Sequence, residues 1–471
     1  MHKLAFFPDY RQRSFASKKQ FMMYTQTEAG KNVLIHGEGR VKKKILFANI
    51  PADGHYSPLT GLAVQLKQEG HDVRWYTGPS CASKIKRLGI PFYLFNKAKE
   101  VTVHNIDEVF PERKAIKNHV KKIIFDICTY FIERGTEFYE DIKDINRSFD
   151  FDILVCDSAF TGMSFVKEKL NKHAVCVGII PLTAYSKNLP PPVMGLTPAK
   201  TMAGKGLYAF LRFLMDRWLF KKPHALIDEQ FERAGMDRQG KNLFDVQIDK
   251  CTLFLQSGTP GFEYERNSLS PHVRFIGPVL PYNKGARQPL RCEDKLHRYQ
   301  HVVLVTQGTF EKDVRKLIVP AIEALKNSNT LVVVTTAGSS TDMLRKQYQA
   351  YENIVIEDFI PFQDIMPYAD VFISNGGYGG VLQSISHKLP MVVGGIYEGK
   401  NEICARVGYF KLGINLRTDH PKPEKIRKAV AEVIKNPLYQ KNVAICADEF
   451  SQYDPARLFA RFIQDLPPLV K

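Results

Sequence analysis

The sequence predicts an α/β protein with two Rossmann-like α/β/α domains that face each other across a cleft. Short apolar segments alternate with segments of helical period from residue 44 onward, and the alternation restarts after a proline-rich stretch at 271–281. Apolar strands connected by helices form parallel sheets that are covered on both faces. Ligands bind such sheets at the carboxyl ends of the strands, so two halves of this kind enclose a site between them.

The expected strands follow the apolar segments. In the first half they are residues 45–50, 73–76, 153–156, 174–180 and 252–256. In the second half they are residues 302–306, 331–335, 354–356, 371–374 and 391–393. A loop over 51–57 and a helix over 59–69 complete the first strand-helix-strand unit, because apolar residues recur at helical spacing until Gly70.

The 471 residues exceed the length that one hydrophobic core supports, so we expect more than one domain. The predicted domains span residues 44–281 and 282–454. Residues 1–43 are polar, basic and aperiodic, which predicts a flexible or loosely docked extension. Residues 455–471 should contain a terminal helix, with Asp454 as its N-cap and Pro455 at the first helical position.

Composition restricts the class of protein. Eight scattered cysteines without a CxxC pair indicate neither a disulfide framework nor a zinc site, and reduced thiols fit the cytoplasm. No apolar run reaches the roughly 18 residues that span a bilayer, so no integral membrane association is expected. The net charge of +17 comes from dispersed residues, and no nucleic-acid-binding module is recognisable. We therefore expect a cytoplasmic monomer or homodimer with small-molecule partners.

A glycine-rich turn follows the predicted strand 371–374 and precedes a helical pattern. It contains Gly376, Gly377, Tyr378, Gly379 and Gly380. Glycines allow a phosphate to approach the backbone, and the amides and dipole of a helix N-terminus favour negative charge. The turn therefore predicts a site for a diphosphate.

Two polar residues follow strands of the first half and could perform acid–base chemistry. His55 lies in the predicted loop after the first strand, and Asp157 follows the strand 153–156. An imidazole can accept a proton near neutral pH, and a carboxylate can orient it. Taken singly, His55 could be an ordinary loop residue and Asp157 a helix N-cap.

Several motifs together resemble the inverting family 1 glycosyltransferases with the GT-B fold, which include UDP-glycosyltransferases and macrolide glycosyltransferases. They are residues 51–58, Asp157, residues 259–264, residues 306–309 and residues 358–407. The resemblance spans about residues 44–465. The segment LFANIPADGHYSPLTGLA, residues 46–63, also resembles bacterial flavonoid rhamnosyltransferases.

The resemblance implies transfer of a sugar from a nucleoside-diphosphate sugar to a hydroxyl of a lipophilic, phenolic or flavonoid acceptor. His55 would be the general base and Asp157 its partner, and the anomeric configuration would invert. Phe359 would stack on the nucleobase, with the Ile360 backbone pairing with the base edge. The residues that would contact phosphate are Gln307, Gly308, Thr309 and the glycine turn. The resemblance also implies that residues 44–281 bind the acceptor, that residues 282–454 bind the nucleotide sugar, and that the helix within residues 455–471 crosses back to the first domain. No metal or other cofactor is implied.

Three departures from the family concern the donor. Asn375 stands where the family has histidine, and its amide could still donate to phosphate. Gln383 stands where an acid binds the ribose. The acid–amide pair that grips glucose is replaced by Gly399-Lys400, so that only Glu398 or Glu402 could substitute. A deoxysugar donor such as dTDP-rhamnose is therefore considered beside UDP-glucose.

The acceptor should contact the least regular part of the first half, residues 184–224. An apolar stripe there has helical spacing and basic neighbours. We expect Phe210, Leu214 and Trp218 to bind the acceptor if this stripe forms a lid. The alternatives are a helix packed on its own domain and a helix on a membrane surface.

Other functional classes fit less well. An oxidoreductase would have GxGxxG after the first strand, where this chain has Asn49 to Gly54. Residues 394–400 match part of a P-loop, but Asn401 replaces the Ser or Thr that binds magnesium. A catalytically impaired nucleotide-sugar-binding protein and a GT-B sugar-nucleotide epimerase remain as alternatives to the transferase.

Overall fold

The computed structural model describes residues 41–102, 105–283, 290–397 and 399–469. Residues 42–471 form one compact unit. The extension expected over residues 1–43 lies, except for its last three residues, outside the described residues.

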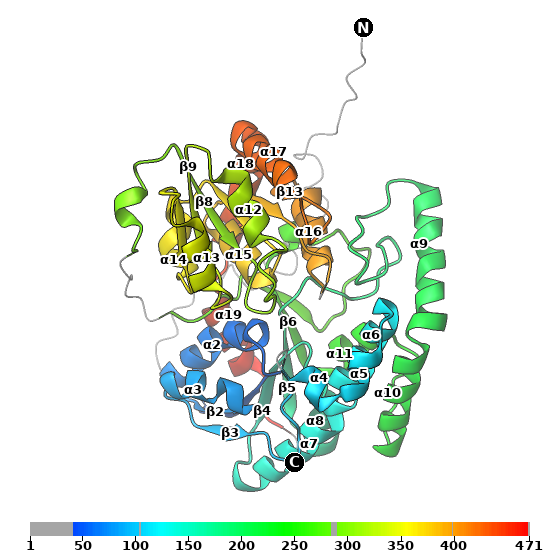
Figure 1. The fold of residues 1–471 in the computed structure, drawn as a ribbon. Coiled ribbons are helices and arrows are strands. Elements are labelled where there is room, and N and C mark those ends of the chain that lie inside the picture. The colour runs from blue at the N-terminus through cyan, green and yellow to red at the C-terminus, as the bar shows by residue number, and fades with distance from the viewer. Residues whose placement is uncertain (1–40, 103–104, 284–289, 398, 470–471) are drawn as a thin grey trace. The chain divides into compact units, whose positions relative to one another are not determined.

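The first half contains a seven-stranded parallel sheet in the order β3-β2-β1-β4-β5-β6-β7 (Figure 1). Its strands are β1 Lys44–Ala48, β2 Asp72–Thr77, β3 Phe92–Leu94, β4 Ile153–Asp157, β5 His173–Gly178, β6 Leu253–Ser257 and β7 Val273–Gly277. The two edge strands were not predicted. β3 has only three residues, and β7 lies inside the proline-rich stretch that we interpreted as a boundary.

The second half contains a six-stranded parallel sheet in the order β10-β9-β8-β11-β12-β13. Its strands are β8 His301–Thr306, β9 Thr330–Thr335, β10 Ile354–Glu357, β11 Val371–Ser374, β12 Met391–Val393 and β13 Gly413–Asn415. The five predicted strands are confirmed to within one residue at each end, and β13 is an additional short edge strand. The two parallel sheets confirm the predicted fold class.

Helices cover both sheets. In the first half they are α2 Asp53–Gln68, α3 Pro79–Arg87, α4 Ile106–Val109, α5 Pro111–Ala115, α6 His119–Phe125, α7 Arg134–Ser148, α8 Met163–Leu170, α9 Met202–Leu214, α10 Lys221–Arg233 and α11 Leu243–Lys250. In the second half they are α12 Ile318–Leu325, α13 Thr341–Tyr348, α14 Phe362–Ile365, α15 Tyr378–Ser386, α16 Lys400–Tyr409, α17 Pro423–Lys435, α18 Pro437–Phe450 and α19 Pro455–Asp465. Two π-helical segments, η1 Asp126–Ile132 and η2 Met215–Leu219, and three 3₁₀ turns, η3 Pro260–Phe262, η4 Glu293–Lys295 and η5 Met366–Tyr368, complete the structure.

Successive residues of each central strand pack on opposite faces of the sheet. In β1, Ile45 and Phe47 contact one apolar cluster, whereas Leu46 and Ala48 contact another. In β8, Leu304 and Val305 divide in the same way. This alternation explains why the strands read as continuous apolar runs, since both faces are buried.

Helix α2 begins six residues earlier than expected. The sequence analysis places residues 51–57 in a loop and the helix at residues 59–69. The structure instead accommodates Pro58 inside the helix, with Asp53 in the first turn, where its charge complements the helix dipole. His55 therefore lies in a helical first turn and not in a loop.

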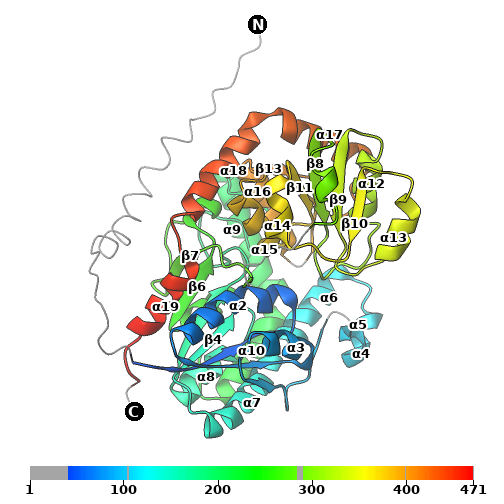
Figure 2. The ribbon, with the colours of Figure 1, turned by 90° about the vertical axis from the view of Figure 1, so that its left-hand side faces the viewer.

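The terminal helix α19 packs beside α2 (Figure 2). Asp454 caps it by accepting a hydrogen bond from the Arg457 amide. Phe459 and Ile463 are fully buried in the cluster that also contains Phe47 of β1. The last helix of the chain therefore completes the core of the first sheet.

Candidate functional site

A cleft of about 1940 Å³ lies where the carboxyl ends of the two sheets face each other. Residues that follow β4, β8 and β11 line it, together with the first turn of α2. Ligands bind open α/β sheets at such strand ends.

His55 and Asp157 meet in this cleft. His55 Nδ1 lies 2.8 Å from Asp157 Oδ1, and the imidazole is partly exposed whereas the carboxylate is fully buried. The backbone amides of Ile50 and Ala159 donate to the same carboxylate at 3.0 and 2.8 Å. The carboxylate is thus fixed from three sides, and it caps no helix, because α8 begins only at Met163.

This geometry determines which ring nitrogen can react. A carboxylate beside Nδ1 favours the tautomer that carries its proton there. Nε2 is then the unprotonated nitrogen, and His55 lines the cleft. The pair can therefore accept a proton from a hydroxyl bound in the cleft.

The glycine turn connects β11 to α15. Gly376 has a φ of +82°, and a Cβ at this position would overlap Cys404 Sγ, so that only glycine fits. Gly377 precedes the helix, and the amides of its first turn have no intrahelical acceptor. Gly377, Gly379 and Gly380 line the cleft, whereas Gly376 shapes the turn from behind.

The Tyr378 side chain has a different role from its backbone. Its hydroxyl donates to the Ser257 carbonyl at 2.7 Å, and its ring stacks with Phe262 at 6.4 Å between centroids. Both partners belong to the first half. Tyr378 thus offers only its backbone to the cleft and fastens α15 to the opposite half.

The segment after β8 forms another part of the cleft wall. Gln307, Gly308 and Thr309 all line the cleft. Gln307 is buried, and its Oε1 has no hydrogen-bond partner among the described residues. Asn375 also lines the cleft, and its amide donates to the Gln307 carbonyl, which braces two strand ends. The amide has a second N–H, so the expected contact with a phosphate stays a prediction.

Phe359, Ile360 and Gln383 also line the cleft. The Phe359 ring is 75% exposed and is open to stacking by a planar ligand. The Ile360 side chain is buried, which leaves its backbone for polar contact. Gln383 Nε2 donates to the Gly379 carbonyl at 3.3 Å, which leaves its oxygen as an acceptor.

Glu402 does not line the cleft. Its Oε1 accepts from the Gly195 amide at 2.7 Å, and its Oε2 lies 3.2 Å from Arg406 Nη1. Both carboxylate oxygens therefore already have partners within the protein. This corrects the expectation that Glu402 could bind sugar hydroxyls. Glu398 lies outside the described residues.

The predicted acceptor residues lie outside the cleft as well. Phe210 and Leu214 of α9 and Trp218 of η2 do not line it. Helix α9 buries no residue, and Phe210 and Trp218 are exposed to solvent. The adjoining π segment contributes Met215 and Leu219 instead.

Sequence reasoning missed most of the apolar wall on the acceptor side. It comes from α6 and η1 and includes Val120, Ile123, Ile127 and Phe131. Their spacing of three or four residues was a usable signal for a helix. This spacing was not recognised because charged residues interrupt this part of the sequence.

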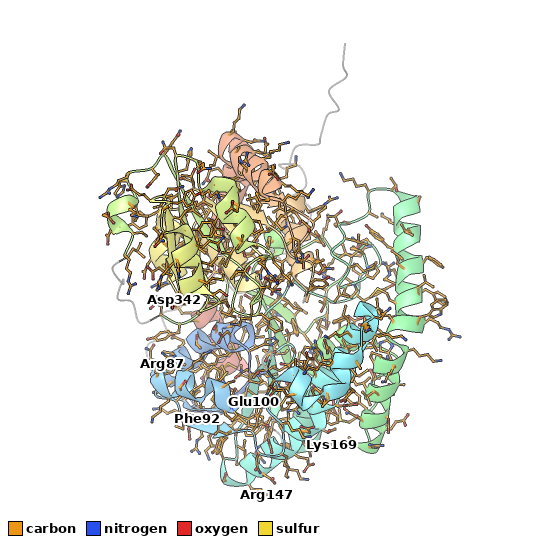
Figure 3. All side chains as sticks on the ribbon, in the orientation of Figure 1. Arg87, Phe92, Glu100, Arg147, Lys169 and Asp342 are labelled. Carbon is orange, nitrogen blue, oxygen red and sulfur yellow. The ribbon has the colours of Figure 1, made fainter. Side chains whose placement is uncertain are left out.

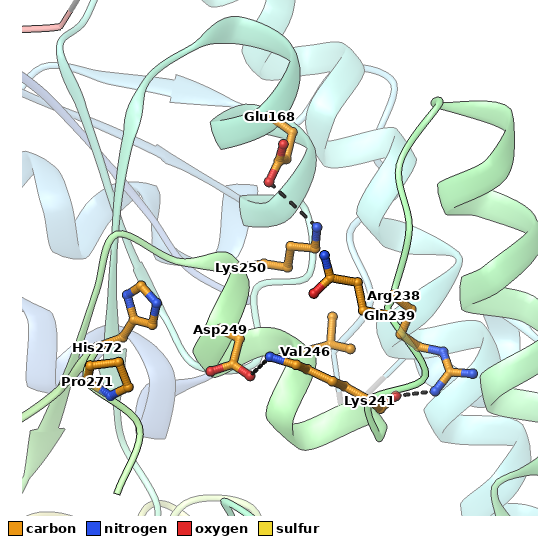
Figure 4. Close-up of a pocket in the computed structure, with 9 residues that line it drawn as sticks. All are labelled: Glu168, Arg238, Gln239, Lys241, Val246, Asp249, Lys250, Pro271 and His272. Atoms are coloured by element: carbon orange, nitrogen blue, oxygen red, sulfur yellow. Dashed lines mark hydrogen bonds and ion pairs between the residues drawn. The ribbon is translucent and has the colours of Figure 1, made fainter.

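The remaining surface offers few alternatives. A smaller pocket of about 370 Å³ beside α11 contains the ion pairs Lys250–Glu168 and Lys241–Asp249, which leave its charges paired (Figure 4). Charged side chains such as Arg147 and Lys169 lie on the outer helices (Figure 3). No set of three or more His, Cys, Asp or Glu residues in the described ranges could hold a metal. None of the described helices could cross a membrane.

Two Rossmann-like halves around such a cleft define a GT-B enzyme, and comparisons with known proteins agree. Residues 321–464 match the family model for the erythromycin biosynthesis protein CIII-like C-terminal domain. The chain is 30% identical over 411 residues to 4'-demethylrebeccamycin synthase of Lentzea aerocolonigenes, covering 87% of this chain and 96% of that protein. It is 25% identical over 433 residues to UDP-glucosyltransferase A1 of Starmerella bombicola, covering 90% and 92%.

Solved structures show the same fold. The kitacinnamycin glycotransferase superposes with a TM-score of 0.68 at 15% identity, covering 91% of this chain and all of that one. The calicheamicin glycosyltransferase CalG4 gives 0.68 at 18% identity, covering 90% and 98%. The spinosyn rhamnosyltransferase SpnG, complexed with thymidine diphosphate, gives 0.64 at 13% identity, covering 90% and 100%. The chain belongs to the family 1 glycosyltransferases with the GT-B fold, enzymes that transfer sugar from a nucleotide sugar.

Proposed function

We propose that the protein is an inverting O-glycosyltransferase in which His55 is the general base. The observation that carries this proposal is the His55 Nδ1–Asp157 Oδ1 hydrogen bond of 2.8 Å, made by a histidine that lines the cleft. His55 Nε2 takes the proton of an acceptor hydroxyl, and the oxygen attacks the anomeric carbon of the donor. The bond from that carbon to the diphosphate breaks, and the configuration inverts.

The departing diphosphate binds at the N-terminus of α15. Its charge is stabilised by the first-turn amides and the helix dipole, the latter contributing about 0.3–1 kcal/mol at an exposed site. We propose that this site works without a metal ion. A chelator such as EDTA should then leave the rate unchanged, whereas a loss of activity restored by Mg²⁺ would contradict this part of the proposal.

The donor carries a deoxyhexose such as rhamnose on dTDP, with UDP-glucose as the competing candidate. The contacts of Glu402 with Gly195 and Arg406 support the deoxysugar. They remove one of the two acids that could take over the binding of glucose hydroxyls. The rhamnosyltransferase among the structural neighbours agrees with this choice, whereas the relatives named UDP-glucosyltransferases favour glucose.

The acceptor is a lipophilic phenol of flavonoid type. Apolar side chains from α6, η1 and η2 support this class, since they line the cleft near His55. A cytoplasmic location is proposed with it, and the eight cysteines, all free and buried, support a reducing compartment.

The variant His55→Asn tests the proposal. It should reduce sugar transfer by about 10²–10⁴-fold, the usual contribution of a general base, while nucleotide affinity stays the same. His297→Asn, at an exposed histidine, is the matched control. Unchanged transfer by His55→Asn would refute the assignment of the base.

A further inference from the structure

Helix α9 presents an apolar face to solvent. None of its residues is buried, and Phe210, Phe213 and the nearby Trp218 are 56%, 61% and 76% exposed. Leu207 precedes Phe210 by three residues, as Phe210 precedes Phe213, so these side chains share one side of the helix. Figure 1 shows α9 apart from both sheets.

Two polar side chains of the same helix, those of Tyr208 and Arg212, face inward. The Tyr208 hydroxyl donates to the Thr197 carbonyl at 2.7 Å. The Arg212 guanidinium donates to the carbonyls of Leu189 and Lys187 and lies 5.4 Å from the centre of the Tyr185 ring. This reverses the usual arrangement, in which a surface helix turns its apolar side to the core. The outward apolar face is therefore fixed by specific contacts.

Basic residues border this face. Residues 200–222 contain six basic residues and one acidic residue, Asp216, so their net charge is 6 − 1 = +5. Arg212 points inward, and the other five are exposed: Lys200, Lys205, Arg217, Lys221 and Lys222. Like charges would oppose the pairing of this face with a second copy, whereas anionic headgroups complement it.

We propose that residues 202–219 dock on the surface of an anionic phospholipid bilayer. The aromatic and aliphatic side chains enter the boundary between headgroups and acyl chains, and the flanking lysines contact the headgroups. No crossing of the bilayer is involved. The occupant is a lipid surface because an apolar face with a basic border is the pattern that such surfaces select.

Docking would also orient the cleft. Met215 and Leu219 of η2 line the cleft, whereas Trp218 between them is exposed. One short segment thus forms both a wall of the cleft and part of the docking face. A lipophilic acceptor dissolved in the bilayer would then have a short path to the cleft. This consequence rests on the proposed function, but docking itself does not.

Flotation of the full chain with vesicles tests the proposal without any substrate. The vesicles contain phosphatidylcholine with about one-third phosphatidylglycerol, or phosphatidylcholine alone. The protein should float with the anionic vesicles and bind neutral ones at least about tenfold more weakly. The double variant Phe210→Ser/Trp218→Ser should lose at least about tenfold in affinity for anionic vesicles.

Matched controls separate docking from general effects. Met343→Ser/Ile445→Ser removes exposed apolar side chains elsewhere and should bind like the wild type. Lys221→Glu/Lys222→Glu should abolish the preference for anionic vesicles, whereas Lys435→Glu/Lys441→Glu should retain it. Thermal unfolding midpoints should stay unchanged for the serine variants, because the replaced side chains are exposed.

Three results would overturn the proposal. The first is wild-type protein that floats with neither kind of vesicle. The second is Phe210→Ser/Trp218→Ser protein that floats like the wild type. The third is a dimer that the double variant dissociates without any vesicle binding, which would assign the face to a second copy. Glycosyl transfer in detergent-free solution reports on the proposed reaction separately.

Discussion

At the scale of single residues, the buried Asp157 carboxylate determines how His55 can act. Both carboxylate oxygens accept hydrogen bonds, from His55 Nδ1 and Ala159 N at Oδ1 and from Ile50 N at Oδ2. In Asp157→Asn, the amide NH₂ must face one of these N–H groups in either orientation. We therefore predict a decrease in transfer rate of about 10²–10⁴-fold, because a neutral amide no longer stabilises the protonated imidazole and, in one of its two orientations, also opposes the Nδ1 proton.

Steady-state kinetics and nucleotide binding check this prediction together. Nucleotide affinity should change by less than about twofold, because Asp157 belongs to the opposite half of the cleft. Asp152→Asn is the control, since Asp152 accepts from the Lys44 amide at the other end of the same strand pair. A rate for Asp157→Asn close to that of the control would contradict the role of Asp157.

His224 gives a prediction about pH and stability. Burial, followed by the charge of Arg238, lowers the pKa of His224 below its usual 6.5, although Asp216 and Asp228 oppose this shift. The unfolded chain therefore takes up this proton first as the pH falls through 6.5, and unfolding becomes more favourable. When the pH falls from about 7.5 to 5.5, the midpoint of thermal unfolding should therefore decrease less in His224→Gln than in the wild type. If the unfolding midpoint depends on pH equally in both proteins, His224 makes no contribution to the loss of stability in acid.

At the scale of elements, the turn before α15 depends on one glycine. Gly376 combines a positive φ with the lack of space for a Cβ beside Cys404. Gly376→Ala should therefore destabilise the fold and weaken nucleotide binding. The Cβ of Gly379→Ala meets no atom within 4 Å, so this variant should keep the unfolding midpoint. Gly379 lines the cleft, so the added methyl group should interfere with the diphosphate at the site that we propose for it.

Calorimetric titration with UDP and dTDP, together with thermal unfolding, distinguishes these two effects. We expect weaker nucleotide binding in both variants but a lower midpoint only in Gly376→Ala. Gly206→Ala, in open space on α9, controls for the change from glycine to alanine. Normal nucleotide affinity in both site variants would place the diphosphate elsewhere.

Sequence patterns predicted the central elements better than the edges. The strands β8 and β11 were evident because both of their faces are buried. The edge strands β3 and β13 have only three residues each, so their apolar signal is short, and β7 was obscured by the proline-rich stretch that contains it. His55 and Asp157 could be singled out by their positions after strands, even though the helix that carries His55 begins earlier than expected.

The orientation of α9 could not be predicted. Its periodicity identifies an apolar face correctly, but periodicity alone does not state whether that face meets the core or solvent. The inward bonds of Tyr208 and Arg212 decide the matter, and both involve carbonyls distant in sequence. The engagement of Glu402 was equally hidden, because its partner Gly195 is remote along the chain.

At the scale of the whole molecule, a buried ion network joins the two halves. Arg406 of α16 lies 2.9 Å from Glu263 of the first half and 3.2 Å from Glu402, and all three side chains are largely buried. Burial alone would lower the pKa of Arg406, but Glu263, Tyr264 and Glu402 raise it above its usual value. The motif 259–264 thus connects the two halves through the hydrogen bonds that Glu263 accepts from Arg406.

Replacing Arg406 should show how much this ion network contributes to the free energy of unfolding. Arg406→Met leaves the largely buried carboxylates of Glu263 and Glu402 without their cation, which should cost about 3–5 kcal/mol in the free energy of unfolding. Arg233→Met, which breaks the exposed pair with Glu229, should change stability little. Urea unfolding measures both variants, and equal stability of the two would mean that the network contributes nothing.

The central claim is that the cleft transfers a sugar from a nucleotide to an acceptor hydroxyl with inversion. The most direct test incubates the protein with a flavonol and either dTDP-rhamnose or UDP-glucose, then determines the product mass and the anomeric configuration. We predict a product that has gained one deoxyhexose, with the configuration opposite to that of the donor. A retained configuration, or no product from either donor despite nucleotide binding, would contradict the account.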